Sequence, residues 1–293
     1  MTFPRIFDKL VIFGVGLIGG SVALALKQAG QGGTIVGVGR IGDPLQEAID
    51  LGVIDHAENA EQAVSDADLI LLATPVGQFP AILKNIAPHL SPNVVITDAG
   101  STKGDIVAAA RAHLGNRLNR FVPAHPIAGA EKSGVTAARA GLFSGKNVVL
   151  TPLIETDEDA TQKTETFWRA CGANVSQMMP ETHDRIFAAV SHLPHLLAFA
   201  LVAEIAKRPN AEQILGFAAG GFRDFSRIAG SSPEMWRDIC LVNRDALLQE
   251  IDAYQAQLTQ IRDMIERSNS SALEGVFQTA RQARNKWIKT SDR

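Results

Sequence analysis

Short apolar runs alternate with stretches of helical periodicity over the first 180 residues of the chain. The apolar runs are rich in Val, Ile and Leu and do not strictly alternate with polar residues, which is typical of strands covered on both faces. They predict strands at 10–14, 34–38, 69–73, 94–98, 121–124, 147–151 and 173–177, and helices such as 18–29, 105–114 and 159–171. This alternation predicts an α/β fold with a doubly wound, mostly parallel, Rossmann-like sheet.

The pattern becomes entirely helical after Pro180. Apolar residues three or four apart predict a long amphipathic helix over 184–205, which Pro194 is expected to kink or locally open. A second long helix is predicted from Ser232, its N-cap, to about residue 267.

The second long helix carries apolar residues at 247–265 in the rhythm of a helix–helix seam. One short domain cannot fully cover such a stripe, so we expect a symmetric homodimer. About 25 residues follow this helix, too few for a separate regulatory module. The sequence thus predicts an α/β domain over 1–179 and an all-α helical dimerisation domain over 180–293.

Composition narrows the class of protein. A length of 293 residues at about 150 per domain agrees with two domains. A hydrophobic content of 46% excludes a disordered chain, and a net charge of −3 excludes a general basic face for nucleic acid. The apolar run at 10–26 contains four glycines and is shorter than the ~20 residues of a membrane span. We therefore expect no targeting segment, no membrane partner and a cytoplasmic location, which two cysteines without a disulfide framework also fit.

A glycine-rich turn joins the first predicted strand to the first helix. In the G-x-G-x-x-G pattern, Gly14 permits the tight turn, Gly16 lets a pyrophosphate approach the backbone, and Gly19 lets the helix pack on the strand. Backbone N–H groups at the helix start, including those of Leu17 and Ile18, would then bind the diphosphate. The pattern predicts a dinucleotide site at these five residues, and an ordinary glycine-rich turn is the alternative.

The end of the second strand indicates which dinucleotide binds. An acid at this place usually binds the ribose hydroxyls of NAD, but here the strand ends in Gly39-Arg40, with no acid until Asp43. Arg40 suits a 2′-phosphate, so we predict NADP, with NAD possible. The alternative is that Arg40 stacks on adenine or faces water.

Other polar residues follow later strands, at the edge where such sheets bind ligands. Thr74 and Pro75 are expected to line the nicotinamide side, and Ser101 to form a hydrogen bond there or, alternatively, to cap a helix. His125 follows another strand, and its imidazole titrates in the range needed by a base that takes a hydroxyl proton.

Two histidines and an arginine are the candidates in the helical part. His192 and His195 share one helix face and are expected to contact substrate, whereas a metal site with His183 matches no common zinc spacing. We predict no metal. An arginine in the glycine-rich bend at 220–227 would bind a carboxylate bidentately; a surface pair of Asp224 with Arg227 is the alternative.

Taken together, these motifs resemble the prephenate dehydrogenase family, with its arogenate and cyclohexadienyl dehydrogenases, over nearly the whole chain. The resemblance rests on GVGLIGGS at 14–21, ATPV at 73–76, DAGSTKG at 98–104, HPIAGAEKSG at 125–134, SHLPH at 191–195 and GGFRDFSRIAGSSPEMW at 220–236. It implies oxidative decarboxylation of prephenate to 4-hydroxyphenylpyruvate with hydride transfer to a nicotinamide cofactor, or of arogenate to tyrosine. It also implies an active site between a dinucleotide-binding domain and a helical dimerisation domain.

The resemblance further implies roles for single residues. His125 would be catalytic, with Ser101 as its hydrogen-bonding partner. His195 would contact the substrate and Arg227 would bind its carboxylate. Two acids, Asp224 and Glu131, would be polar gate partners of that arginine.

One position departs from the family, since Ala130 stands where some relatives carry Thr and so lacks any side-chain contact made there. A two-domain hydroxyacid dehydrogenase is a rival interpretation, but it would need a catalytic Lys on the helical domain, where Lys207 lies near the end of the first helical stretch. A non-catalytic dinucleotide sensor is another, which turnover of prephenate would exclude.

Overall fold

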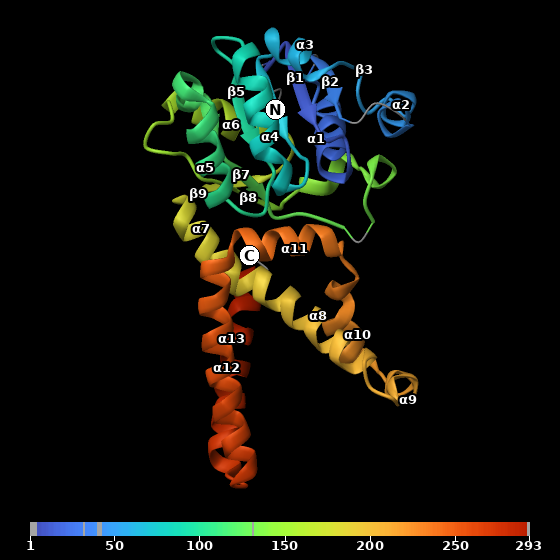
Figure 1. The fold of residues 1–293 in the computed structure, drawn as a ribbon, viewed down its shortest axis with the longest axis vertical. Helices are drawn as coiled ribbons and strands as arrows, with labels where there is room; N and C mark the ends of the chain where they lie inside the picture. Colours follow the sequence, from blue (N-terminus) through green and yellow to red (C-terminus); the bar gives the residue numbers. More distant parts are fainter. Residues whose placement is uncertain (1–4, 32, 40–42, 131, 292–293) are drawn as a thin grey trace. The chain divides into compact units, whose positions relative to one another are not determined.

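The structure is a computed structural model that describes residues 5–31, 33–39, 43–130 and 132–291 (Figure 1). The chain divides into two compact units, Met1–Arg244 and Asp245–Arg293. The domain boundary between residues 179 and 180 stays a prediction.

A six-stranded parallel sheet forms the centre of the first unit. The strand order is β3-β2-β1-β4-β5-β6, in agreement with the doubly wound sheet predicted from the sequence. The strand β3 was not predicted because it has only two residues, both exposed. The strands are β1 (Lys9–Phe13), β2 (Thr34–Val38), β3 (His56–Ala57), β4 (Leu69–Leu72), β5 (Val95–Asp98) and β6 (Phe121–Val122).

Helices cover both faces of this sheet because alternate strand residues point to opposite sides. Leu10 and Ile12 pack with residues of α1 (Leu17–Gln28) and α6 (Glu158–Ala170). On the opposite face, Val11 packs with apolar residues of three helices. These are α3 (Ala60–Ser65), α4 (Phe79–Ile86) and α5 (Gly104–His113), and α2 (Asp43–Asp50) follows β2 (Figure 1).

A second, three-stranded sheet corrects the prediction of a single one. It consists of β7 (Ala124–Pro126), antiparallel to β8 (Asn147–Leu150), which is parallel to β9 (Asn174–Gln177). The chain leaves the parallel sheet at Pro123, which has no N–H to continue the ladder.

The helix predicted over 184–205 is interrupted. It consists of α7 (Pro180–Phe187), a π-helical turn (Ala188–His192) and α8 (Leu193–Ala206). The opening expected at Pro194 lies just before it, since this proline has no N–H to donate to the preceding turn.

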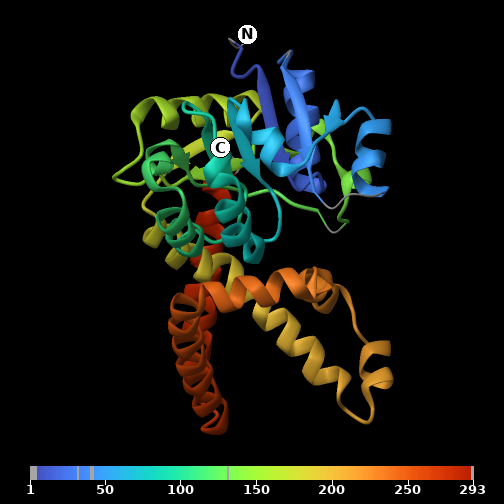
Figure 2. The same cartoon turned by 45° about the horizontal axis from the view of Figure 1, so that its top comes forward.

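Three further helices complete the first unit. They are α9 (Ala211–Gly216), α10 (Gly220–Ser226) and α11 (Pro233–Val242). The α10 helix and the short turn after it (Arg227–Gly230) return along α8 (Figure 2).

Within the described residues, the stretch Pro180–Ala206 is long and apolar enough to cross a membrane by length and composition alone. This is weak evidence, because core and interface helices of folded domains meet the same test. His183 and His192 on this stretch are fully buried and hydrogen-bonded to other polar side chains. We interpret it as a helix of a folded domain.

The helix predicted from Ser232 to about residue 267 is two helices. Ser232 does cap the first, accepting a hydrogen bond from the Met235 N–H, but α11 ends at Val242 and α12 (Arg244–Glu266) follows. Asn243 leaves the helical conformation at the junction, where its side chain bonds to α7 and to the π-helical turn.

The second unit contains most of α12 and the helix α13 (Ser270–Ser291), which the sequence did not predict. Ser268 adopts a positive φ of 51° in the turn between them, and the Asn269 side chain caps α13 at Ala272 N–H. Apolar side chains such as Leu258, Ile265 and Phe277 are exposed on these helices.

Candidate active site

The three glycines of the turn after β1 have the geometry that a dinucleotide site requires. Gly14 has a φ of +90°, and a Cβ on Gly19 would lie 2.3 Å from the Gly14 carbonyl oxygen, so neither position accepts a side chain. A Cβ on Gly16 would meet nothing within 4 Å, so the space above this glycine is open. Gly16 precedes the first turn of α1, which contains no acid, and Leu17 and Ile18 begin this helix. The helix start is therefore accessible to an anion.

A buried hydroxyl lies beside this turn. Thr74 follows β4, its methyl group lies next to Gly14, and its Oγ1 is buried with no hydrogen-bond partner in the described part of the chain. Such an orphaned group fits a polar ligand at this edge of the sheet. Pro75 next to it is exposed. Arg40, on which the NADP prediction depends, lies outside the described residues.

A buried ion pair fixes the backbone in front of His125. Asp98, the last residue of β5, accepts hydrogen bonds from the Lys103 ammonium and from the N–H groups of Gly100 (2.7 Å) and Ala124 (2.9 Å). The Lys103 ammonium also donates to the Ala124 carbonyl at 2.7 Å. Burial raises the pKa of Asp98, and the Lys103 charge opposes this. Both polar groups of Ala124 are thus held, which positions the next residue.

A chain of three side chains begins at His125. Its Nδ1 lies 2.8 Å from Nε2 of His183, whose Nδ1 lies 2.8 Å from Oδ1 of Asp184. The Asp184 carboxylate also accepts the N–H groups of Lys103 (2.9 Å) and Gly104 (2.7 Å) at the start of α5. It therefore satisfies the first N–H groups of this helix.

The cap of α5 decides one alternative for Ser101. Lys103, not Ser101, occupies the N-cap position, so the interpretation of Ser101 as a helix cap is wrong. Ser101 lies half-buried in the loop after β5, and its partnership with His125 stays a prediction.

Burial determines the charge of these groups. It lowers the pKa of His125 well below the usual value, and the charges of His183, Lys103 and His192 act in the same direction. Burial also lowers the pKa of His183. Burial alone would raise the pKa of Asp184, but its hydrogen bonds with His183 and the two N–H groups lower it. Both imidazoles are consequently neutral beside an ionised carboxylate at neutral pH.

Aromatic contacts enclose the two imidazoles. The Phe187 ring centroid lies 4.7 Å from that of His125 and 4.4 Å from that of His183. His125 is 8% exposed and His183 has no exposed surface, so the pair is largely shielded from water.

His192 is buried and bonded within the protein. Its Nδ1 accepts a hydrogen bond from the Asn243 amide at 3.0 Å, and the same amide donates to the Asp184 carbonyl at 2.8 Å. Burial lowers the pKa of His192 to about 4. This histidine joins α11 to the π-helical turn, and its predicted contact with substrate stays a prediction.

His195 is the partly exposed histidine of this helix. It stacks on Trp236 with ring centroids 3.7 Å apart, and its Nδ1 lies 2.8 Å from the Ser191 carbonyl oxygen. Burial lowers the pKa of His195, and the positive charge of Arg227 adds to this effect. The structure therefore brings together His195 and Arg227, two residues predicted to hold substrate. Asp224 lies exposed on α10, one turn before Arg227, whereas Glu131 lies outside the described residues.

Sequence reasoning missed several members of this site. Asp98, Lys103, Asp184, Trp236 and Asn243 had no assigned role. His183 was considered only as a metal ligand, and no cluster of three or more metal-binding side chains occurs in the described ranges. The sequence offered one local signal for the ion pair, an Asp and a Lys five residues apart at the end of a predicted strand.

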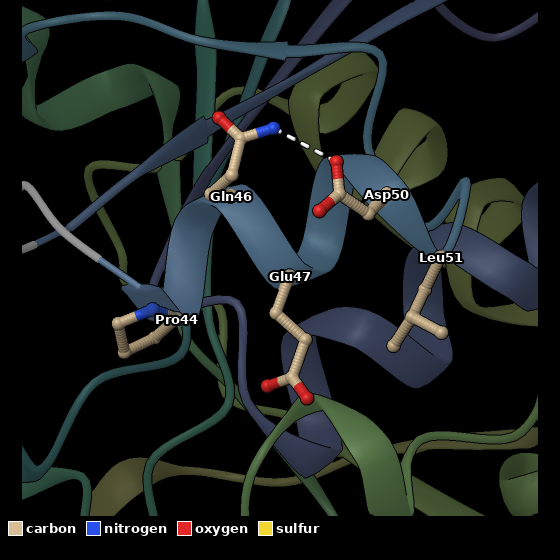
Figure 3. A pocket seen from close by; sticks show the side chains of 5 residues that line it. All are labelled: Pro44, Gln46, Glu47, Asp50 and Leu51. Atoms are coloured by element: carbon tan, nitrogen blue, oxygen red, sulfur yellow. Dashed lines mark hydrogen bonds between the residues drawn. The ribbon is translucent and has the colours of Figure 1, made fainter.

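A separate, open pocket of about 530 Å³ lies on α2 (Figure 3). Pro44, Gln46, Glu47, Asp50 and Leu51 line it, and the Gln46 amide donates to Asp50 at 2.8 Å. Its two carboxylates do not favour an anionic ligand, and none of the predicted site residues lines it.

The sheet order, the glycine-rich turn and the buried histidine together define a dinucleotide-dependent oxidoreductase. Residues 22–177 match the sequence model for the nucleotide-binding domain of prephenate dehydrogenase, and residues 179–279 match that for its dimerization domain. The chain belongs to the prephenate dehydrogenase family.

Individual relatives agree with this assignment. The chain is 38% identical to prephenate dehydrogenase of Bacillus subtilis, over 95% of this chain and 76% of that protein. It is 33% identical to cyclohexadienyl dehydrogenase of Zymomonas mobilis, over 95% and 96% of the two chains. A crystal structure of prephenate dehydrogenase from A. aeolicus with hydroxyphenyl propionate and NAD+ has a TM-score of 0.89 and 37% identity, and covers 95% of this chain and 98% of that one.

Proposed function

We propose that this protein catalyses the oxidative decarboxylation of prephenate to 4-hydroxyphenylpyruvate and CO2, with hydride transfer to a nicotinamide dinucleotide. The observation that carries the proposal is the buried, neutral His125 in a chain of this family. Oxidation of an alcohol carbon requires a group that takes the hydroxyl proton, and a neutral imidazole is suited to this.

The chain's own residues handle one proton and orient the substrate. When bound, the oxidised nicotinamide supplies the hydride acceptor. As hydride leaves the carbinol carbon, His125 accepts the hydroxyl proton and a carbonyl forms. The ring carboxylate then departs as CO2, and its bonding pair enters the ring, which becomes aromatic as a phenolate; the phenolate oxygen takes up a proton to give the phenol. Aromatisation makes the reaction irreversible, so orientation is the main task of the protein.

The remaining site residues receive binding roles in this proposal. Arg227 holds a substrate carboxylate, as its bidentate geometry allows, and His195 contacts the substrate beside it. Ser101 forms a hydrogen bond near the substrate and the nicotinamide. Asp224 and Glu131 are proposed as gate partners of Arg227.

The cofactor groups have matching places. The open space above Gly16 receives the diphosphate at the start of α1, Gly14 makes the turn, and Gly19 lets the helix pack on the strand. Thr74 with Pro75 lines the nicotinamide side.

The choice between NAD and NADP depends on two opposing observations. The A. aeolicus relative was crystallised with NAD+, which favours NAD. The sequence after β2 continues with Gly39-Arg40, without the acid that selects NAD, which favours NADP. The preference for NADP stays a prediction. Comparing kcat/KM for both cofactors in the wild type and in Arg40→Ala tests it, and a ratio unchanged by the substitution would show that Arg40 does not contact the phosphate.

The protein is proposed to act as a cytoplasmic homodimer. Its C-terminal region matches a dimerization domain, and apolar side chains are exposed on α12 and α13. Light scattering at micromolar concentration should give twice the chain mass of 31.3 kDa, and a monomer would contradict this.

A substrate assay tests the activity itself. Purified protein should reduce the nicotinamide cofactor in the presence of prephenate, and arogenate should be compared because one solved relative is an arogenate dehydrogenase at 29% identity. His125→Ala should lower kcat by about 10²–10⁴ with cofactor affinity unchanged. The exposed His89→Ala is the matched control. Cofactor binding without turnover of either substrate would favour the sensor instead.

A further inference from the structure

We infer that Asp184 and His183 are positioning residues that set the ring nitrogen of His125 on which the proton resides. This inference rests on the function proposed above. The carboxylate, the two imidazoles and the start of α5 form one continuous hydrogen-bonded series, at distances of 2.7–2.9 Å.

The order of donors and acceptors along this series has one solution. The Asp184 carboxylate can only accept, so Nδ1 of His183 carries a proton and donates it. The other nitrogen of neutral His183, Nε2, is then an acceptor, and it receives the proton on Nδ1 of His125. His125 is left with an unprotonated Nε2, which is the nitrogen that accepts the substrate's hydroxyl proton.

The far end of the series is held by the fold. The N–H groups of Lys103 and Gly104 both point to the Asp184 oxygens, and a helix start favours a negative charge there. His183 has no exposed surface, so water cannot replace either partner. The carboxylate therefore stays ionised and fixes the direction of donation as far as His125.

Among the described residues, the titratable groups around His125 come from three places. His183 and Asp184 come from α7, Lys103 and Asp98 from β5 and the loop after it, and His192 from the π-helical turn. The Lys103 charge, His183 and His192 all disfavour a second proton on the His125 ring. The ring therefore stays neutral until it takes the hydroxyl proton of the substrate.

Asp184→Asn reverses the series at its origin. The amide oxygen would keep the shorter of the two backbone hydrogen bonds, that from the Gly104 N–H at 2.7 Å, so the NH₂ would replace Oδ1 and the Lys103 N–H would lose this acceptor. The NH₂ would then donate to Nδ1 of His183, whose Nε2 would donate to Nδ1 of His125 and place the His125 proton on Nε2. The equivalent carboxylate-to-amide change beside a catalytic histidine of a serine protease costs about 10⁴ in kcat. We expect kcat with prephenate to fall by about 10²–10⁴ and KM to change by less than about threefold. A wholly structural role would instead change cofactor affinity and thermal stability.

His183→Gln supplies the rescue. A glutamine oxygen at the position of Nε2 is always an acceptor, so it accepts the proton on Nδ1 of His125 whichever side chain stands at position 184. The double variant Asp184→Asn with His183→Gln should therefore be at least tenfold more active than Asp184→Asn alone. Two independent structural losses would make the double variant worse than either single one.

A ¹⁵N spectrum of histidine-labelled full-length protein reads the tautomer without any substrate. His125, assigned with His125→Ala, should carry its proton on Nδ1 in the wild type and on Nε2 in Asp184→Asn. The same tautomer in both proteins, or a double variant less active than Asp184→Asn, would overturn the inference. If the spectra change as expected but wild type does not oxidise prephenate, the proposed function fails and the tautomer assignment stands.

Discussion

Two glycines three residues apart in the turn after β1 should respond to alanine in opposite ways. In Gly19→Ala, the new Cβ would lie 2.3 Å from the Gly14 carbonyl oxygen and 2.8 Å from Ile12 Cγ2. The carbonyl cannot move without shifting the strand, so we estimate the upper part of the overpacking range, about 3 kcal/mol. The helix propensity of alanine returns about 1 kcal/mol, which leaves a loss of about 2 kcal/mol.

Gly16→Ala should instead preserve stability and lose cofactor. A Cβ there meets no atom within 4 Å, and the φ of −103° is accessible to alanine. The poorer N-cap and the reduced entropy of the unfolded chain nearly cancel, so the free energy of unfolding should change by less than about 0.5 kcal/mol. The methyl group would stand where the diphosphate approaches, and we expect the cofactor Kd to rise at least about tenfold, or about 1.4 kcal/mol.

Urea denaturation and a cofactor titration by calorimetry separate the two effects. Gly19→Ala should lower the unfolding midpoint, and thermal scans should show a loss of about 4–8 °C. The reasoning fails if Gly16→Ala destabilises the protein as much as Gly19→Ala does. It also fails if Gly16→Ala binds the cofactor with unchanged affinity.

Three further predictions address the site around His125. Arg227→Ala should raise KM for prephenate strongly and change kcat less, because losing a bidentate carboxylate contact costs about 2–4 kcal/mol of mostly uniform binding. Arg223→Ala, one turn earlier on α10, is the control, and an unchanged KM with lower stability would indicate a structural role for Arg227. Lys103→Met should lower the free energy of unfolding, measured by urea denaturation, by about 3–5 kcal/mol, because it leaves the Asp98 carboxylate buried without its cation. Adding Asp98→Asn should recover part of the loss, and a loss below about 1 kcal/mol for Lys103→Met alone would contradict the role of the pair. The pKa of His192 is lowered from 6.5 to about 4, so this residue binds fewer protons in the folded than in the unfolded protein, and the free energy of unfolding should fall by up to about 3 kcal/mol as the pH drops from about 6.5 to 4. His192→Gln should flatten this pH profile, and a slope unchanged by the substitution would point to other groups.

The parallel sheet was predictable because its signals are local. Each strand except the two-residue β3 is marked by an apolar run, and the glycine pattern follows the first one directly. The departures come from single residues that act on hydrogen bonding. Pro123 moves β7 into a second sheet, and Asn243 divides the last predicted long helix because its amide bonds to α7 and the π-helical turn.

The candidate site was predictable only where a residue follows a strand or stands in a family motif. His125, His195 and Arg227 met one of these conditions. Asp184 did not, because its partners at the start of α5 lie about 80 residues earlier in the chain. No periodicity or spacing encodes such a pairing, which arises when α7 packs against α5. His183 is separated by 58 residues from His125 for the same reason.

The π-helical turn at Ala188–His192 makes the length of this segment as important as its composition. Each residue of an α-helix turns the chain by about 100°, so a deletion that converts the wide turn to regular helix would rotate everything beyond it by about that angle. His195 would leave Trp236, while His183 on the near side would stay with His125. Substitutions on the exposed face of this helix should therefore be tolerated, whereas the insertion or deletion of one residue between His183 and His195 should not. Surface loops show the opposite pattern, since they tolerate insertions and deletions.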